Sequence, residues 1–442
     1  MTGIGRRQFL GGAAAGLTLL ATRGRQNIGA KLDSKIEVLI NEPIGPISPD
    51  LYGHFVEHLG GVVYDGIWVG ADSKVPNVGG IRRALVEHMQ RIKPPVVRYP
   101  GGCFADSYDW RDGVGPRARR PRRTGFWGRL EPNEFGTNEF ARFCQLTGAQ
   151  PYLAANLRGL PAQSFYEWVD YCNSPAGGTT LAELRASGEA GSAAPFGVRY
   201  WGVGNEAWGC GGNMTPEEYA MEFRRFTAAV PGYGLQPRFI ASGPNSGDLN
   251  WTRGFFSRMA EKRQFNFYGW ALHYYTWNLS RGLTDDWEKG KGDALNFDLE
   301  EWYELLRQGD RMEMLIRDTW NAMGEFDHEH RVKIAVDEWG AWYKPGTEVH
   351  PSHTLGQMPT LRDALLSALT FDTFNRQADK VVMANAAQLI NCLHSLFLAH
   401  EAQFVATSNF HVFEMYAAHQ GAQSVRALFD APEVRHTRLG RP

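Results

Sequence analysis

Short apolar runs alternate with helical patterns along most of the chain. Eight runs rich in apolar, β-branched and aromatic residues have the composition of buried strands. They lie at 51–58, 96–99, 151–156, 200–204, 238–242, 267–273, 333–336 and 380–384. Helical patterns lie between them, for example at 134–147, 161–171, 216–229, 299–323 and 361–374. Eight strands alternating with helices predict an α/β fold, a (β/α)8 TIM barrel with loop insertions.

The fourth run leads directly to a candidate catalytic group. The apolar residues 200–203 are followed by Gly-Asn-Glu, which ends at Glu206. Further on, Thr215 and Glu218 have the spacing of a capping box, with Pro216 at the first position of a helix. A buried strand therefore delivers a carboxylate just before a helix, and in a parallel barrel this end of the strands holds the chemistry.

A second run has the same form. The strand 333–336 ends in Asp337, Glu338 and Trp339, and Glu338 lies 132 positions after Glu206 (338 − 206). Pairs of carboxylates cleave glycosidic bonds, because one protonates the leaving oxygen while the other attacks the anomeric carbon or activates water. The two pKa values must then be pushed apart by their surroundings. The competing interpretation of either residue is a solvated surface charge.

Other strand ends contribute polar groups that could surround such a pair. These are His54, Glu57 and His58 in the last part of the first run, Asn156 at the end of the third, His273 at the end of the sixth with Tyr275 just after it, and Gln388 after the eighth. Amide, phenol, imidazole and carboxyl groups are what a polyhydroxylated substrate needs, since each hydroxyl requires a donor or an acceptor. Taken singly, the three histidines are more typical of satisfied core or rim positions.

Composition and charge narrow the function classes. The 442 residues have a formal net charge of −2, which argues against nucleic acid as a partner because phosphate binding needs a basic face. The basic run 117–123 could bind an anionic polymer, but it has no interleaved aromatic residues and is more typical of a solvated loop above the barrel rim. The count of 14 tryptophans fits sugar-stacking surfaces and large cores alike.

The cysteines give no sign of a metal site. All five are widely spaced, without a CxxC or Cys/His cluster, so we expect no metal ion and no other cofactor. Because their number is odd, at least one thiol stays unpaired in a monomer. The N-terminal residues, described next, predict export of an already folded chain, and such export gives no reason to expect disulfides.

The first residues have the composition of a targeting segment. Arg6 and Arg7 precede a weakly apolar stretch rich in glycine and alanine, so residues 1–24 are predicted to be a twin-arginine signal. The stretch is too short for a membrane anchor. We therefore expect export to the periplasm or the extracellular space. The alternative is a chance arginine pair on a disordered tail.

Several ordered motifs resemble those of one known family. Together they cover about 36–427, and the chain is similar to the α-L-arabinofuranosidases of glycoside hydrolase family 51. The motifs are Gly-His-Phe-Val-Glu-His at 53–58, Arg-Tyr-Pro-Gly-Gly-Cys-Phe at 98–104, Tyr-Asp-Trp-Arg-Asp-Gly-Val-Gly-Pro at 108–116, Glu-Phe-Gly-Thr-Asn-Glu-Phe at 134–140, Gly-Asn-Glu at 204–206, Leu-His-Tyr-Tyr at 272–275, Asp-Glu-Trp at 337–339 and Ala-Gln-Leu-Ile-Asn at 387–391.

The resemblance implies roles for individual residues. Glu206 would be the general acid/base and Glu338 the nucleophile of a retaining glycosidase that releases terminal α-L-arabinofuranosyl units from arabinan or arabinoxylan. Asn205 would hold the sugar 2-hydroxyl. The resemblance also implies a homo-oligomer. Alternatives are an endo-glucanase, which the same family includes, and a carbohydrate-binding protein without turnover. The remaining implied sugar-binding residues are Glu57, Cys103, Tyr275 and Gln388.

The chain departs from the family pattern in three places. Gly340 stands where the family more often has asparagine, and the charged, Gly-rich segment 278–296 is expected to change the leaving-group side. Family members normally end in a β-sandwich that also takes up the N-terminal strand. Here we expect that strand at 34–48, the barrel at 49–400, and a truncated start of the sandwich with a basic tail at 401–442. An exposed strand edge and lowered stability would follow.

Overall fold

The computed structural model describes residues 34–279, 284 and 286–432. The predicted signal at 1–24 and the basic tail from residue 433 on lie outside the described residues. No helix among the described residues combines the length and the apolar character needed to cross a membrane.

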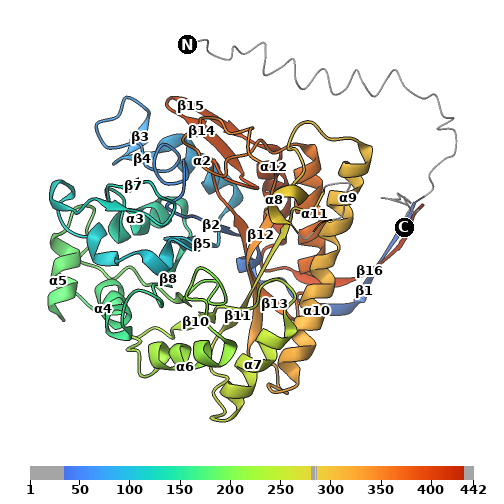
Figure 1. Ribbon diagram of the computed structural model, residues 1–442, viewed down its shortest axis with the longest axis horizontal. Helices are drawn as coiled ribbons and strands as arrows, with labels where there is room; N and C mark the ends of the chain where they lie inside the picture. Colours follow the sequence, from blue (N-terminus) through green and yellow to red (C-terminus); the bar gives the residue numbers. More distant parts are fainter. Residues whose placement is uncertain (1–33, 280–283, 285, 433–442) are drawn as a thin grey trace. The chain divides into compact units, whose positions relative to one another are not determined.

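Eight parallel strands form a closed barrel, as Figure 1 shows. Each strand pairs with the next in chain order, and the last pairs with the first, so that the sheet has no edge. This confirms the predicted α/β barrel. The strands are β2 (Gly53–Phe55), β5 (Val96–Tyr99), β8 (Gln150–Ala155), β9 (Tyr200–Val203), β10 (Arg238–Ala241), β11 (Gly269–Thr276), β12 (Lys333–Ala341) and β13 (Val381–Ala387).

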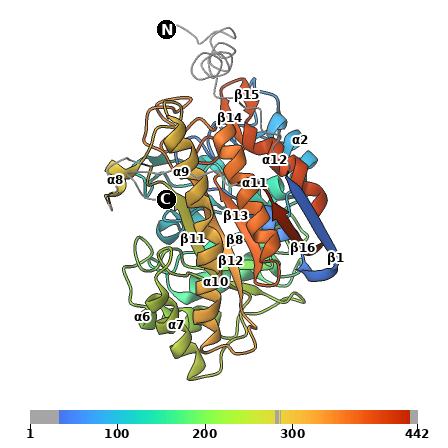
Figure 2. The same ribbon diagram turned by 90° about the vertical axis from the view of Figure 1, so that its right-hand side faces the viewer.

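Helices cover the outside of the barrel (Figure 2). Buried side chains fill its interior. One buried cluster takes a single side chain from each of seven strands, as expected for a packed barrel interior. The larger cluster lies between strands and helices, where the apolar faces of the helices are buried. The main helices are α2 (Arg83–Ile92), α3 (Thr137–Thr147), α4 (Ala162–Asn173), α6 (Pro216–Thr227), α7 (Leu249–Ala260), α9 (Leu299–Gly309), α10 (Arg311–Gly324) and α11 (Leu361–Arg376).

Two predicted elements are wrong in detail. The pattern 299–323 was expected as one helix, but α9 ends at Gly309 and α10 begins at Arg311, because glycine is a poor helix former. The strand expected at 51–58 begins with a 3-10 turn, Pro49–Tyr52, which Ser48 caps, and only Gly53–Phe55 pairs in the sheet. The capping box predicted for Thr215 and Glu218 is present at the start of α6.

The two candidate carboxylates sit differently at their strands. β9 ends at Val203, so Glu206 lies in the turn that follows. β12 continues to Ala341, so Glu338 lies inside this strand and not beyond a strand end at residue 336. Its pairing with β11 passes from Ala271↔Ala335 to His273↔Glu338, which leaves one extra residue on β12. A bulge of this kind redirects side chains and is common beside active sites.

The chain ends outside the barrel are rich in strands. β1 (Lys35–Pro46) and β16 (Gln423–Asp430) pair as a two-stranded sheet, and their outer parts form a compact unit of their own. On β1, Ile36, Val38 and Ile40 are exposed. Before β16, the hairpin of β14 (Phe397–His400) and β15 (Gln403–Ala406) leads into α12 (Ser408–Tyr416). The domain boundaries given above remain predictions.

Candidate active site

All seven residues predicted for the site line one pocket at the carboxyl ends of the barrel strands. The pocket has a volume of about 70 Å³. Glu206, Glu338, Asn205, Glu57, Cys103, Tyr275 and Gln388 contribute to its wall. Segments far apart in the sequence therefore meet here, as expected for this end of a parallel barrel. The rest of the wall is Phe55, Leu59, Gly102, Trp127, Trp342, Leu355 and Leu393.

The two candidate carboxylates face each other across a histidine. One oxygen of Glu206, one oxygen of Glu338 and a ring nitrogen of His273 all lie within 4.8 Å of one another. His273 Nδ1 is 3.0 Å from Glu206 Oε1 and 3.7 Å from Glu338 Oε1. Carboxyls about 5–5.5 Å apart are typical of retaining glycosidases, whereas inverting enzymes need about 6.5–9.5 Å to admit a water. An approach of the two carboxylates within 4.8 Å is nearer to the retaining spacing.

Glu338 is buried and held in its ionised form. Its Oε1 accepts a hydrogen bond from Arg98 Nη1 (2.7 Å) and its Oε2 accepts one from the Tyr275 hydroxyl (2.6 Å). Burial by itself would raise the pKa of Glu338, but the charges of His273 and Arg98 outweigh it, so its pKa is below the usual value. The residue is thus an acceptor and a base at neutral pH, which a nucleophile must be.

Arg98 connects the nucleophile candidate to Asn205, the residue before the acid candidate. Its Nη2 donates to Asn205 Oδ1 (2.6 Å), and its Nε lies 3.4 Å from Asp337 Oδ2. The guanidinium also lies 4.4 Å from the centre of the Phe55 ring. A buried charge without partners would cost several kcal/mol, so these contacts keep Arg98 in one orientation. Arg98 belongs to the motif at 98–104, but no role was predicted for it from the sequence.

Replacing Arg98 by methionine is expected to move the acidic limb of the kcat/KM profile to higher pH. Arg98 lowers the pKa of Glu338, so without it Glu338 binds a proton at higher pH and the active ionised form is lost earlier on acidification. The exposed Arg122→Met is the matched control. Stability should also fall by about 3–5 kcal/mol, because two carboxylates lose a buried partner. An unshifted acidic limb in folded protein would contradict this role.

Glu57 also lines the pocket, but its pKa is shifted in the opposite direction to that of Glu338. It accepts hydrogen bonds from the Phe104 backbone N–H (2.9 Å) and from Gln388 Nε2 (3.1 Å). Burial raises the pKa of Glu57 to about 7; the Phe104 N–H works against this rise and the negative Glu338 adds to it. Near neutral pH this carboxyl can therefore both donate to and accept from a sugar hydroxyl.

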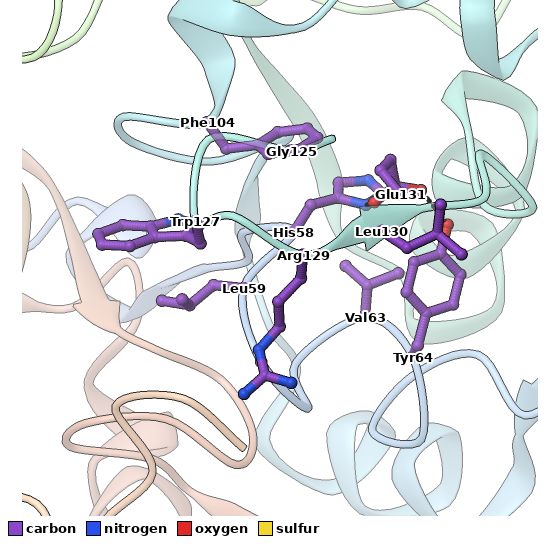
Figure 3. Close-up of a pocket in the computed structure, with 11 residues that line it drawn as sticks. His58, Leu59, Val63, Tyr64, Phe104, Gly125, Trp127, Arg129, Leu130 and Glu131 are labelled. Carbon is purple, nitrogen blue, oxygen red and sulfur yellow. Dashed lines mark hydrogen bonds and ion pairs between the residues drawn. The ribbon is translucent and has the colours of Figure 1, made fainter. Parts of the chain in front are cut away.

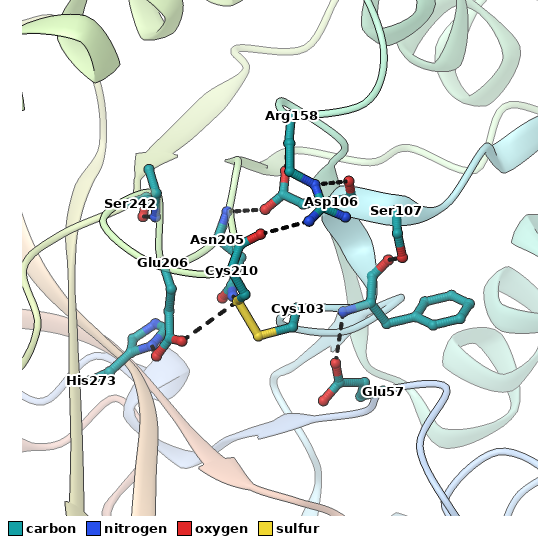
Figure 4. The surroundings of a disulfide bond; sticks show 12 residues. Glu57, Cys103, Asp106, Ser107, Arg158, Asn205, Glu206, Cys210, Ser242 and His273 are labelled. Atoms are coloured by element: carbon teal, nitrogen blue, oxygen red, sulfur yellow. Dashed lines mark hydrogen bonds and ion pairs between the residues drawn. A yellow bond between two sulfur atoms is a disulfide. The ribbon is translucent and has the colours of Figure 1, made fainter. Parts of the chain in front are cut away.

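The turn that carries Glu206 is held in an unusual backbone conformation. Glu206 has a φ of +41°, which costs a residue with a side chain on the order of 1–3 kcal/mol. Its neighbours hold it there: Asn205 N–H donates to Asp106 Oδ2 (2.9 Å) and Ala207 N–H donates to Ser242 Oγ (3.1 Å). Figure 4 shows these side chains around the turn. The conformation directs Glu206 toward His273.

A disulfide links two segments of the site, although the sequence offered no reason to expect one. Cys103, after β5, is bonded to Cys210, in the turn after β9, across a sequence separation of 107 residues (Figure 4). Cys210 Sγ lies 3.8 Å from Glu206 Oε2. Widely spaced cysteines gave no hint of this pairing, which depends on two strand ends meeting in the barrel. The cysteines left free among the described residues are Cys144, Cys172 and Cys392, all buried.

Removing this disulfide is expected to destabilise the protein by roughly 2–5 kcal/mol, because the unfolded chain regains the freedom of a long loop. The double variant Cys103→Ser with Cys210→Ser should melt at a lower temperature than the oxidised wild type. Adding a dithiol should lower the melting temperature of the wild type to that of the variant and leave the variant unchanged. If thiol titration shows that the dithiol has fully reduced the wild type, and the reduced and oxidised wild type still melt at the same temperature, the prediction is contradicted.

His58 belongs to a second, smaller pocket beside the site. Its ring lies 2.7 Å from Glu131 Oε2 and 2.8 Å from the Tyr99 hydroxyl, which makes it a satisfied buried histidine. The pocket has a volume of about 60 Å³ and shares Leu59 and Trp127 with the candidate active site. Figure 3 shows Trp127 at one end of this pocket and His58 with Glu131 at the other.

The other two histidines differ from each other. His54 is fully buried against Phe413, and neither ring nitrogen has a hydrogen-bond partner among the described residues. Burial lowers the pKa of His54 to about 3, so it is a neutral core residue. His273 lies between the two carboxylates. Burial lowers the pKa of His273, and the negative Glu338 and Glu206 raise it more, to above its usual value. The sequence around each histidine does not show which one lies in the core and which one lies beside the carboxylates.

Three of the five arginines in the basic run 117–123 form ion pairs within the chain. Arg117 and Arg120 pair with Glu139 (2.8 and 3.0 Å), and Arg123 pairs with Asp112 (2.8 Å). Arg120 is buried, so the run is more embedded than the solvated loop that we expected. These pairs reduce the positive charge that the run could offer to an anionic polymer, and leave Arg119 and Arg122 exposed.

The fold explains why residue 340 is a glycine. Its φ is +149°, and a Cβ at this position would lie 2.5 Å from the Cβ of His394. A larger residue would require both a strained backbone and movement of His394. Two positions later, Trp342 lines the pocket and packs against Tyr275 and Trp287, with ring centres 5.0 and 4.7 Å apart. The segment after β11 thus supports the wall of the pocket.

Two family models match the chain. The model described as "Alpha-L-arabinofuranosidase 1 domain" matches residues 88–291, and the model described as "Alpha-L-arabinofuranosidase C-terminal domain" matches residues 337–440. The matched segments contain Glu206 and Glu338 respectively.

Relatives with established names cover most of the chain. It is 35% identical to an intracellular exo-α-L-arabinofuranosidase of Bacteroides ovatus over 401 residues, 90% of this chain and 75% of the relative. It is 29% identical to an intracellular exo-α-(1→5)-L-arabinofuranosidase of Acetivibrio thermocellus over 372 residues, 79% and 68% of the two chains. Both relatives are named as intracellular, so the prediction of twin-arginine export to the periplasm or extracellular space is wrong.

A solved structure agrees with these relatives. The family 51 arabinofuranosidase of Xanthomonas axonopodis pv. citri superposes with a TM-score of 0.85 at 36% identity, covering 92% of this chain and 80% of that one. Barrel, motifs and sequence identity over most of the chain lead to the same assignment. This chain belongs to glycoside hydrolase family 51, the α-L-arabinofuranosidases.

Proposed function

We propose that this glycosidase releases terminal α-L-arabinofuranosyl units with retention, with Glu206 as general acid/base and Glu338 as nucleophile. The observation that carries this proposal is the approach of the two carboxylates to within 4.8 Å in a pocket at the carboxyl end of the barrel. A retaining double displacement requires this short spacing, because the nucleophile itself must reach the anomeric carbon.

The first step starts from Glu338 in the ionised form that its surroundings favour. Ionised Glu338 attacks the anomeric carbon, and Glu206 gives its proton to the departing glycosidic oxygen. The bond between the sugar and the leaving group breaks as the bond to Glu338 forms. Arg98 and Tyr275 orient the attacking carboxylate through their hydrogen bonds.

The second step reverses the roles. Glu206, now ionised, removes a proton from water, and the water oxygen displaces Glu338 from the anomeric carbon with a second inversion. His273 lies beside both carboxylates and supports their negative charge in turn. Asn205, which accepts a hydrogen bond from Arg98, would hold the 2-hydroxyl of the sugar.

The lining of the pocket favours a sugar. Glu57, Gln388 and Asn205 in its wall offer carboxyl and amide groups that can hydrogen-bond the hydroxyls of a furanosyl ring. We propose arabinan- and arabinoxylan-type polysaccharides and oligosaccharides as substrates. The arabinofuranosidase names of the relatives support this choice over an endo-glucanase.

The test is hydrolysis of an aryl α-L-arabinofuranoside followed by NMR during the first turnovers. We expect α-L-arabinofuranose as the first product, before mutarotation, and free arabinose from arabino-oligosaccharides. A first product of β configuration would exclude the proposed pair of roles. Shortening of a β-glucan without release of arabinose would indicate an endo-glucanase, and binding without turnover would indicate a carbohydrate-binding protein.

The assembly state is a separate proposal. The resemblance implies a homo-oligomer, and β1 exposes three large apolar side chains that an interface could cover. Light scattering across a range of protein concentrations would show a mass that is a multiple of the single chain. A constant single-chain mass would contradict the proposal.

A further inference from the structure

Three histidines gather away from the catalytic pair. His350 and His353 lie between β12 and α11, and His400 ends β14. One ring nitrogen from each lies within 4.8 Å of one from each of the others. The rings of His350 and His400 are stacked with centres 4.4 Å apart, and His353 lies 5.7 Å from both.

Each of these rings is anchored through one nitrogen. Asp65 Oδ2 lies 3.2 Å from His353 Nε2 and 2.8 Å from His400 Nδ1, and Ser352 Oγ lies 2.7 Å from His350 Nδ1. The opposite nitrogen of His353, Nδ1, is buried and has no hydrogen-bond partner among the described residues. Histidines that bind a metal usually present this pattern, with one nitrogen on a carboxylate or other acceptor and the second on the ion.

The shared carboxylate is itself held in place. Asp65 Oδ1 accepts a hydrogen bond from the Glu401 N–H (2.8 Å) and lies 3.3 Å from Arg82 Nη2. Arg82 is buried and also donates to the Gly66 carbonyl (3.0 Å). Asp65 therefore orients two imidazoles at once from a rigid position, which is what pre-organises a metal site.

We propose that His350, His353 and His400 bind one divalent transition-metal ion that prefers imidazole, such as Zn²⁺, with Asp65 as the carboxylate behind two of the rings. Imidazole nitrogens suit Zn²⁺, Ni²⁺ and Cu²⁺, whereas Mg²⁺ and Ca²⁺ prefer oxygen. In tetrahedral coordination at about 2.0–2.1 Å, ligand nitrogens lie roughly 3.4 Å apart. The ring nitrogens lie within 4.8 Å of one another, so binding requires the partly exposed His350 and His400 to move closer.

The ion would join the segment after β12 to the end of β14, and through Asp65 also the segment after β2. Asp65 follows β2, His350 and His353 follow the nucleophile strand β12, and His400 ends β14. Leu355, two residues after His353, lines the active-site pocket, and its carbonyl accepts the Leu393 N–H (2.9 Å). The ion therefore acts as a structural tether of the pocket wall and takes no part in bond cleavage.

The experiment measures binding of Zn²⁺ to the chelator-treated, oxidised full chain by equilibrium dialysis. We expect one Zn²⁺ per chain, and an affinity at least ~100-fold weaker in His350→Ala and in His400→Ala. His411→Ala, which changes an exposed histidine on α12, should bind like the wild type. Saturating Zn²⁺ should raise the melting temperature of the wild type by roughly 2 °C or more and leave the two site variants unchanged.

Co²⁺ in place of Zn²⁺ gives a second readout. A visible d–d band that appears in the wild type and is absent in both site variants would place the ion on these rings. No saturable binding to folded wild-type protein would overturn the proposal. So would unchanged affinity in His350→Ala and His400→Ala, because the ion would then sit elsewhere, for example on Glu206, His273 and Glu338. None of these measurements depends on the proposed catalytic activity.

Discussion

Replacing Glu338 by alanine is expected to lower kcat for an aryl α-L-arabinofuranoside by roughly 10⁴–10⁶-fold, since no other group can form the covalent intermediate. Glu338 lies inside β12, with Arg98 and Tyr275 fixing both of its oxygens. The surrounding polar groups remain, so the loss measures the missing nucleophile together with some unpaired charge on Arg98.

Azide distinguishes a nucleophile from a structural residue. In Glu338→Ala the anion can enter the space left by the carboxylate and attack the anomeric carbon directly, so the product is the inverted β-L-arabinofuranosyl azide. Circular dichroism confirms that the variant is folded, and the exposed Glu329→Ala should retain full activity. Recovery of activity without formation of a sugar azide would contradict the assignment of Glu338. So would a sugar azide that retains the α configuration.

Replacing Glu206 by alanine is expected to give a loss that depends on the leaving group. For arabino-oligosaccharides, whose leaving alkoxide needs a proton, kcat/KM should fall by roughly 10²–10⁴-fold. For a dinitrophenyl arabinofuranoside, which departs without a proton, formation of the intermediate should be much less affected, and breakdown of the intermediate should limit turnover. Rates on substrates with leaving groups of graded acidity measure this difference.

The same variant should respond to azide with the opposite stereochemistry. Azide intercepts the intermediate on Glu338 without needing a general base, so the product is the retained α-L-arabinofuranosyl azide. Glu217→Ala, on the first turn of α6, is a matched control on the same βα segment. A loss of equal size for all leaving groups would show that Glu206 does not transfer the proton.

The fold could be predicted from local patterns because each barrel strand is buried on both faces. The run 200–204 has only apolar and glycine residues, and the run 96–99 is interrupted only by Arg98; the observed strands are Tyr200–Val203 and Val96–Tyr99. The errors fall where local patterns compete. The periodic run 299–323 concealed a break at Gly309. The end of β12 was misplaced because its polar residues 337 and 338 are buried by a bulge against β11.

The site was predictable in part for the same reason. Glu206 and Glu338 follow or interrupt apolar runs, so their position along the chain already suggested the rim of a barrel. Arg98 lies one residue before a strand end, and nothing in its local sequence reveals that it contacts Glu338, 240 positions away. The disulfide and the three-histidine cluster likewise join segments with no common pattern.

The sequence by itself determined the succession of strands and helices and the chemical types at the strand ends, since burial periodicity and capping are local properties. Only the tertiary structure decided which of these groups meet. Barrel closure brings Glu206 and Glu338 within 4.8 Å, and places Cys103 against Cys210. Distances across the barrel, and the charges that shift the pKa values of Glu57 and Glu338, depend on contacts between distant segments that no local window contains.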